Sequence, residues 1–177
     1  MNFLCLDFIN SRWYITHKTF HDPMDSQDWL EKISANYGLP EICLVKNIDD
    51  LKTFRELLFH ALFGLCVEQK IEPNYIQKIN EALTNGHVQT VLISKGDGYC
   101  LQVHHHSDDL TWVMYQIALS FSELITKYPL ENLKKCENPD CDWIFYDDSK
   151  SHTRKWCDNR CASLMKVRKF RAKGAEK

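Results

Sequence analysis

Four cysteines near the C-terminus constrain this chain more than any other feature of its sequence. They form two close pairs, because four residues separate Cys136 from Cys141 and three separate Cys157 from Cys161, with fifteen residues between the pairs. Two thiol pairs joined by a spacer suit the tetrahedral geometry of Zn²⁺ bound by four cysteines. A redox centre and the simple burial of four small side chains are the alternatives, and the paired spacing favours zinc over burial.

A zinc site of this kind is expected to be structural rather than catalytic. Four thiolates complete the coordination shell and leave no open position for a substrate. A segment of about 40 residues cannot build a self-sufficient core, whereas structural Zn²⁺ contributes about 10–16 kcal/mol in small fingers. We therefore expect one structural Zn²⁺, with Cys136, Cys141, Cys157 and Cys161 as its ligands.

Charge is distributed unevenly along the chain. Residues 1–149 contain 12 basic and 22 acidic side chains, a net charge of −10, whereas residues 150–177 contain 10 basic and 2 acidic ones, a net charge of +8. A basic tail on an otherwise acidic chain indicates a polyanionic partner, and we predict that this partner is DNA. A solvated tail that only balances the charge of the remainder is the alternative.

The basic residues gather on one side of a predicted C-terminal helix. At about 100° per residue, Lys166, Lys169 and Lys173 lie within about 60° of one another. Cys161, Leu164, Met165 and Ala172 lie near the opposite side and are expected to face the rest of the finger. The basic side chains form a predicted phosphate-contacting surface. The candidate DNA-binding residues are Arg154, Lys155, Lys166, Arg168, Lys169, Arg171 and Lys173.

The first 135 residues have the patterns of a mainly helical domain. Apolar residues recur at intervals of three and four between capping and stop signals, such as Ser26 and Gly38. The period then changes to two on either side of a Lys-Gly-Asp-Gly turn, which predicts a β-hairpin. We predict helices over residues 25–38, 47–68, 73–86 and 109–128, and the hairpin over residues 88–106.

The predicted fold class is therefore mainly α with a β-hairpin. Residues 1–130 form a helical N-terminal domain, and residues 131–177 form a small treble-clef-like four-cysteine zinc finger that ends in the basic helix. Asp7 interrupts the apolar N-terminal segment too early for a signal peptide, and no apolar stretch reaches about 18 residues. We therefore expect a cytoplasmic protein without a membrane segment, in which the cysteines stay reduced.

The sequence predicts no enzymatic activity, because it contains no Gly-rich phosphate loop, no G-x-S-x-G and no H-E-x-x-H motif. A His–metal nuclease is the enzymatic alternative, and it requires a histidine that activates water together with ligands for a catalytic metal. His152 lies between the cysteine pairs, but no histidine follows Cys161, so that set is incomplete. The run His104–His106 is more typical of a surface feature, because His105 points away from its two neighbours in a strand.

The finger resembles the CGNR zinc finger. The stretch CENPDCDWIFYDDSKSHTRKWC, followed by a last cysteine and KVRKFRA, has the cysteines, the W-x-F-x-D strand and the basic helix of that family. The resemblance implies that the four cysteines bind zinc and that Asp147, Ser149, Arg154 and Trp156 form the family's turn. The family's Gly-Asn-Arg is replaced by Ala-Ser-Leu at residues 162–164, and the second cysteine pair is one residue closer together. DNA contacts of that Asn-Arg pair would be made differently here.

The N-terminal stretches LCLDFINS and DSQDWLEKISANYGL, with the helix near Trp112, resemble the ABATE domain that usually precedes this finger. Proteins of this kind are regarded as stress-responsive transcription regulators whose finger is presumed to bind DNA. Our leading hypothesis is a zinc-stabilised DNA-binding regulator whose acidic helical N-terminal domain senses a small ligand or a protein. A regulator that reads a two-fold DNA site would do so as a homodimer.

Two questions stay open at this level. Asp7, Asn10 and Arg12 interrupt an apolar segment. These residues either line a ligand pocket or anchor a helix locally, and we favour the local anchor. The basic helix either contacts DNA or docks an acidic protein surface, in which case the finger belongs to a protein-interaction module with a purely structural zinc.

Overall fold

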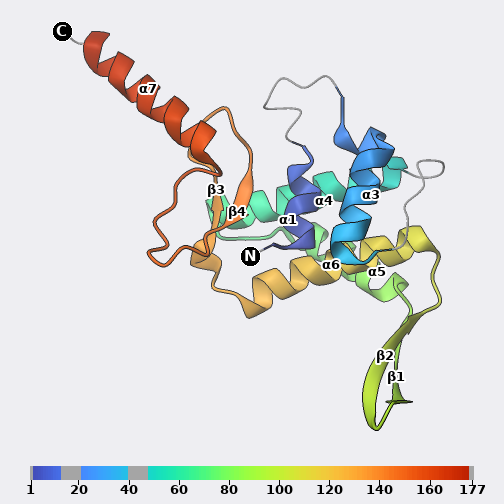
Figure 1. Ribbon diagram of the computed structural model, residues 1–177. Helices are drawn as coiled ribbons and strands as arrows, with labels where there is room; N and C mark the ends of the chain where they lie inside the picture. Colours follow the sequence, from blue (N-terminus) through green and yellow to red (C-terminus); the bar gives the residue numbers. More distant parts are fainter. Residues whose placement is uncertain (1, 13–20, 40–47, 176–177) are drawn as a thin grey trace.

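The structure is a computed structural model that describes residues 2–12, 21–39 and 48–175 (Figure 1). The described residues form α-helices, two short 3-10 helices and two antiparallel strand pairs, so the predicted mainly-α class with a β-hairpin is confirmed. The elements are α1 Leu4–Asn10, η1 Pro23–Asp25, α3 Gln27–Tyr37, α4 Ile48–Glu68, α5 Pro73–Asn85, β1 Val88–Lys95, β2 Gly98–His105, α6 Asp109–Lys127, η2 Leu130–Asn132, β3 Leu133–Lys135, β4 Ile144–Tyr146 and α7 Asn159–Ala175.

Local sequence signals explain where most of these helices begin and end. Gly38 ends α3 in the left-handed region, with φ +62°, and its backbone N–H donates to the Ser34 carbonyl. Pro73 opens α5 at a position where its missing N–H is not needed. Asp108 caps α6 by accepting a hydrogen bond from the Thr111 backbone N–H at 2.9 Å. The four helices predicted before the finger are thus confirmed.

The core lies where α1, α4, α5 and α6 meet. Leu58 and Leu62 of α4 are fully buried, and they belong to one apolar cluster with the buried Ile117 and Phe121 of α6 and Ile9 of α1. The apolar stripe predicted for α4 therefore lies at the centre of the core. In the described part of the chain, no helix combines the length and the apolar character that crossing a bilayer requires.

A buried ion pair ties the start of the chain to this core. Arg55 of α4 donates two hydrogen bonds to the Asp22 carboxylate, at 2.7 and 2.6 Å, and a third to the Ser11 hydroxyl at 3.1 Å. Both charged residues are buried, so each charge depends on the other for compensation. Arg55 thereby fixes η1 and the end of α1 against α4.

The finger shares its core with the helical domain. Leu133 of β3 and Ile144 of β4 belong to the same buried apolar cluster as the helices. β3 lies against α4 and β4 against α1 (Figure 1). The Asn10 side chain of α1 closes this contact, because its Nδ2 donates to the Ile144 carbonyl at 2.7 Å and its Oδ1 accepts from the Ile144 N–H at 3.1 Å.

The two hydrogen bonds between Asn10 and Ile144 form a clamp, and its removal is expected to destabilise the whole chain. Asn10→Ala leaves both backbone groups of Ile144 buried and unpaired, so we expect the free energy of unfolding to fall by about 3 kcal/mol. Chemical denaturation measures the change. Asn36→Ala, at an exposed position of α3, is the matched control and is expected to cost no more than about 0.5 kcal/mol. An Asn10 variant as stable as this control would show that the clamp does not hold the finger against the helices.

Candidate metal centre and basic helix

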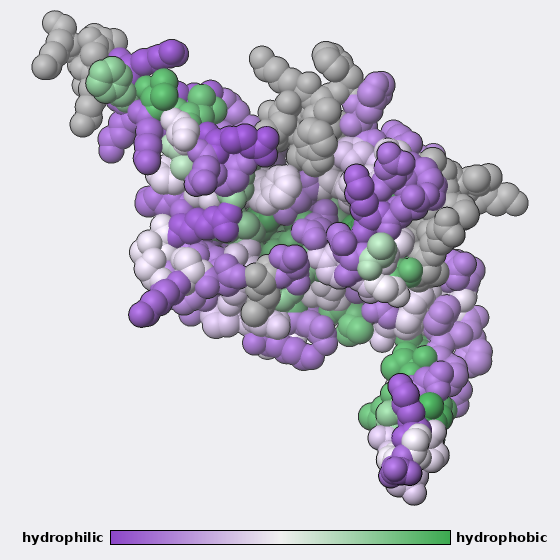
Figure 2. Space-filling view, viewed as in Figure 1, coloured by the Kyte–Doolittle hydropathy of each residue, from purple (hydrophilic) through white to green (hydrophobic). Residues whose placement is uncertain are grey.

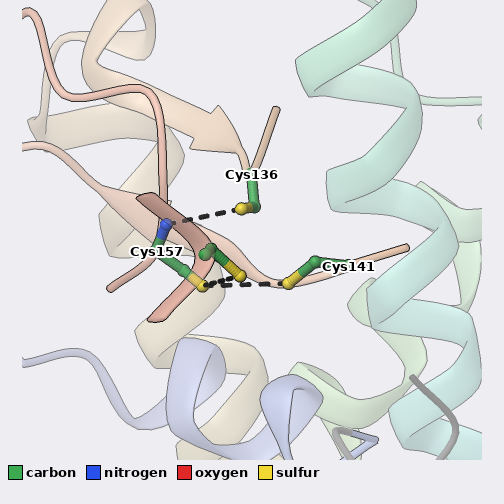
Figure 3. Close-up of side chains that lie close together, drawn as sticks. Cys136, Cys141 and Cys157 are labelled. Atoms are coloured by element: carbon green, nitrogen blue, oxygen red, sulfur yellow. Dashed lines mark hydrogen bonds between the residues drawn. The ribbon is translucent and has the colours of Figure 1, made fainter. Parts of the chain in front are cut away.

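The four cysteines converge at one end of the finger. Cys136 follows β3, Cys141 lies in the loop before β4, Cys157 precedes α7, and Cys161 lies in its first turn. Their sulfur atoms all lie within 4.8 Å of one another, with 3.7 Å between Cys141 and Cys157 and 3.6 Å between Cys157 and Cys161. Figure 3 shows the labelled Cys136, Cys141 and Cys157 pointing toward one another. The two cysteine pairs, which are distant in the sequence, are therefore adjacent in the structure.

The spacing of these sulfur atoms fits a tetrahedral Zn²⁺ site. Zn–S bonds of about 2.3 Å place the sulfur atoms about 3.8 Å apart in an ideal tetrahedron. The separations of 3.7 and 3.6 Å are already close to this value, and the limit of 4.8 Å on the others leaves only small side-chain shifts. Cys136, Cys141 and Cys161 are buried and Cys157 is half-buried, so a metal here is closed off by protein.

The electrostatics of the thiols also favour a metal ion within the cysteine cluster. A hydrogen bond from the Cys157 thiol lowers the pKa of the Cys141 thiol to about 5. That same hydrogen bond, together with burial and the charge on Cys141, raises the pKa of the Cys157 thiol. The thiols are thus close enough for the charge on one to oppose ionisation of the next. Four thiolates require a divalent cation between them.

The first cysteine pair is shaped by Asn138, a residue that the sequence analysis did not single out. Its carbonyl accepts from the Cys141 N–H at 2.9 Å, which closes the turn, and its buried side chain donates to the Cys161 sulfur at 3.4 Å. The Cys157 backbone N–H donates likewise to the Cys136 sulfur at 3.4 Å (Figure 3). Such N–H···S contacts orient the ligands and stabilise thiolate charge.

The second pair is placed by Asp158, which caps α7. Its carboxylate accepts a hydrogen bond from the Cys161 N–H at 2.9 Å and forms an ion pair with Arg160 at 2.8 Å. Burial raises the pKa of Asp158, but the hydrogen bonds from Cys161 and Arg160 outweigh it, so the carboxyl pKa is lowered. An Asp directly before the first helical residue is a recognisable capping signal. It fixes Cys161 within the first helical turn.

Asp147 organises the turn between the cysteine pairs. Its fully buried carboxylate accepts hydrogen bonds from the Lys134 ammonium at 2.7 Å, the Ser149 hydroxyl at 2.6 Å and the Arg154 N–H at 2.9 Å. Burial alone would raise the pKa of Asp147, but these donors lower it well below its ordinary value. Three of the four residues assigned to the family's turn therefore meet at one carboxylate.

Two of the candidate DNA-binding residues are held by the finger itself. The Arg154 guanidinium donates to the carbonyls of Trp156 and Cys157, which lie at the second cysteine pair, and stacks over the Phe145 ring at 4.6 Å. Arg168 of α7 reaches back to the first pair, where it donates to the Asn138 side chain and pairs with Asp140. Both arginines therefore brace the finger.

The remaining candidates lie farther out. Lys166, Lys169 and Arg171 of α7 are exposed to solvent, and Lys155 is exposed with an ion pair to Glu137 at 3.2 Å. Lys173 belongs to α7, but its side chain lies outside the described residues. The structure thus places a short row of solvent-facing cations on the outer turns of the helix.

The packing predicted for α7 is wrong at Leu164 and at Ala172. Leu164 and Ala172 are exposed rather than packed on the finger, whereas Cys161 is buried and Met165 half-buried. The helix leaves the small finger after its first turns and projects away from it (Figure 1). The finger is too short to cover a helix of 17 residues.

The histidines considered for a nuclease site lie apart. One ring nitrogen of His152 lies 2.9 Å from the Asp147 carbonyl. His105 stacks on Trp112 at 4.1 Å, far along the chain from the finger, while His104 and His106 are exposed. Among the described residues, the cysteine cluster is the only group of three or more metal-ligating side chains of this kind.

The segment around Asp7 proves to be both an anchor and part of a cavity. Asn10 anchors β4 as described, and Asp7 accepts a hydrogen bond from the Tyr37 hydroxyl at 2.5 Å. Arg12 pairs with Glu56 at 2.9 Å. A cavity of about 290 Å³ nevertheless opens here, lined by Asp7, Asn10, Ser11, Trp29, Lys32, Ile33, Asn36 and Trp143.

Residues 132–174 match the family model of the CGNR zinc finger. The match contains all four cysteines and Asp147. No curated protein matches the chain. The finger is thus similar to that family, and a four-cysteine metal site consistent with zinc lies within the matched residues. The resemblance of the N-terminal residues to the ABATE domain stays a prediction.

Proposed function

We propose that this protein is a zinc-stabilised DNA-binding transcription regulator. In this proposal one Zn²⁺ is held by Cys136, Cys141, Cys157 and Cys161, and α7 contacts the phosphate backbone of DNA. The observation that carries the proposal is a solvent-facing basic helix that begins at a four-cysteine centre. Its role in a stress response, and the cytoplasmic location, rest on the sequence patterns and resemblances described above.

The surface of α7 supports a backbone contact. Lys166, Lys169 and Arg171 are exposed along the helix, and phosphate contacts by such side chains position a protein on DNA without reading its sequence. The bound metal, Arg154 and Arg168 fix the root of the helix, so its cations are presented in a constant direction. The acidic remainder of the chain would turn away from the same polyanion.

The N-terminal domain is the proposed sensing or interaction domain. Trp143 supports this role, because it lines the 290 Å³ cavity and also packs against the cysteine cluster. Its carbonyl accepts the Cys136 N–H at 2.9 Å. A small ligand in this cavity would therefore contact both the helical domain and a residue that shapes the metal centre.

A protein-interaction module is the second candidate, and one observation favours it. Leu164, Val167 and Phe170 follow one another at intervals of three residues on α7, and all three are exposed. A helix with an exposed apolar row beside basic residues suits a groove on an acidic protein. In this case the zinc finger is a structural brace, and DNA has no part.

Salt dependence of DNA binding separates the two candidates. We expect the logarithm of the DNA association constant to fall linearly with the logarithm of salt concentration, with a slope between about −3 and −5 for four to six phosphate contacts. Fluorescence anisotropy of a labelled duplex, titrated with zinc-loaded protein at several salt concentrations, measures it. An absence of binding at about 50 mM salt would favour the interaction module.

A further inference from the structure

The β1–β2 hairpin projects from the helical domain and ends in solvent (Figure 1). Its eight antiparallel pairs run without a bulge from Val88↔His105 to Lys95↔Gly98. A two-stranded hairpin alone in water is marginally stable, and stable sheets need more strands or a covering element. A hairpin of this length is therefore expected to be stabilised by a further element or partner that covers it.

The exposed apolar side chains of the hairpin gather on one face, whereas Val91 and Ile93 lie on the other face and are half-buried. Residues directly opposite each other share a face, so Leu92 and Leu101 lie side by side with Val103 and Tyr99. These four side chains are 68%, 71%, 51% and 78% exposed, and they form what we call the hairpin apolar face. Figure 2 shows hydrophobic atoms gathered on this arm, away from the predominantly hydrophilic surface around it. Contiguous exposed apolar surface marks an interaction site.

The base of the hairpin is locked in place, so this face is presented in a fixed direction. His105 stacks on Trp112 at 4.1 Å, and Trp112 stacks on Tyr115 at 5.1 Å. The Ser107 hydroxyl donates to the Gly86 carbonyl at 3.3 Å. A Cβ at Gly86 would lie 2.4 Å from the Tyr115 ring, so glycine permits the close approach of hairpin and α6.

Charge identifies the kind of partner. Between residues 88 and 105 the only residues with a full charge are Lys95 and Asp97, both at the tip. This face offers no cation for the phosphates of DNA. A strongly charged protein surface would lose its hydration here without gaining an ion pair. A second copy of the same face suits it, because two identical uncharged faces meet without like-charge repulsion.

We infer that the hairpin apolar face is a homodimer contact, on which a second copy of this chain places the same face about a two-fold axis. The cross-strand pair Leu92↔Leu101 lies at the centre of the contact, and Thr90 and Ser94 lie toward its ends. The two hairpins form a small two-layer sheet with its apolar side chains inside. This inference does not depend on DNA binding.

Sedimentation velocity of the zinc-loaded protein without DNA tests the inference. The chain of 20.9 kDa is expected to sediment at twice this mass at micromolar concentration. Leu92→Thr combined with Leu101→Thr keeps the strand propensity and removes the apolar centre, so the dimer dissociation constant is expected to rise by about 100-fold. Circular dichroism and zinc content report that the variant is folded.

A matched control uses the other face of the same strands. Gln89 and Gln102 are exposed there, and Gln89→Thr combined with Gln102→Thr is expected to leave the dimer intact. A monomeric wild type would overturn the inference, as would a dimer that persists in the leucine variant. Flotation of a monomeric wild type with phosphatidylcholine vesicles would assign the face to lipid instead.

Discussion

Cys157→Ser is expected to abolish zinc binding and to unfold the finger. Cys157 lies at the centre of the cluster, 3.7 Å from the Cys141 sulfur and 3.6 Å from the Cys161 sulfur, and its backbone orients Cys136. A serine hydroxyl is a poor ligand for Zn²⁺, and loss of the metal removes most of the stability of a segment this small. We expect the zinc content to fall from about one per chain to near zero, with loss of helical signal from α7.

Atomic absorption and circular dichroism on one preparation measure both effects. Cys100→Ser is the matched control, because Cys100 lies on the hairpin outside the cluster and is half-buried. It is expected to keep its zinc and its helical content. If the Cys157 variant retained a full equivalent of zinc, the assignment of the four ligands would be wrong.

Lys166→Glu combined with Lys169→Glu is expected to lower DNA affinity by more than about 100-fold at low salt. Each reversal removes one phosphate contact and adds a like-charge repulsion next to the DNA. Both lysines are exposed on α7, so the fold and the zinc content are expected to stay unchanged. Anisotropy titrations at constant salt, with zinc assayed on each sample, give the comparison.

A control variant separates a local contact from a change of net charge. Lys70→Glu combined with Lys78→Glu changes the total charge by the same amount, at exposed positions of the helical domain. This variant is expected to bind DNA within about threefold of the wild type, because distant charges are screened. Equal losses in both variants would mean that net charge, and not the surface of α7, governs binding.

Much of this architecture was predictable from local sequence signals. The hairpin follows from alternating residues around the Gly96 turn, and the end of α3 follows from Gly38, because glycine adopts the positive φ that each site needs. The cysteine cluster follows from the paired spacing. These features depend on residues close in sequence, or on a metal that brings a few strong ligands together.

Other features depend on contacts that no local pattern encodes. α1 has only 7 residues, too few to form a stable helix alone, and it is held by packing on α4 and α6. β3 has 3 residues and exists because β4 pairs with it. The clamp between Asn10 and Ile144 joins residues 134 positions apart. The helical period likewise predicts on which side of α7 Leu164 lies. It does not show how far along the helix the finger covers that side.

Metal content and DNA affinity, both measured on one sample of the purified wild-type protein, test the proposed function most directly. We expect about one zinc per chain and DNA binding that weakens steeply between about 50 and 200 mM salt. One zinc per chain without salt-sensitive DNA binding would contradict the proposed function and leave the finger as a structural brace. A protein that binds DNA equally well without zinc would contradict the role assigned to the four cysteines.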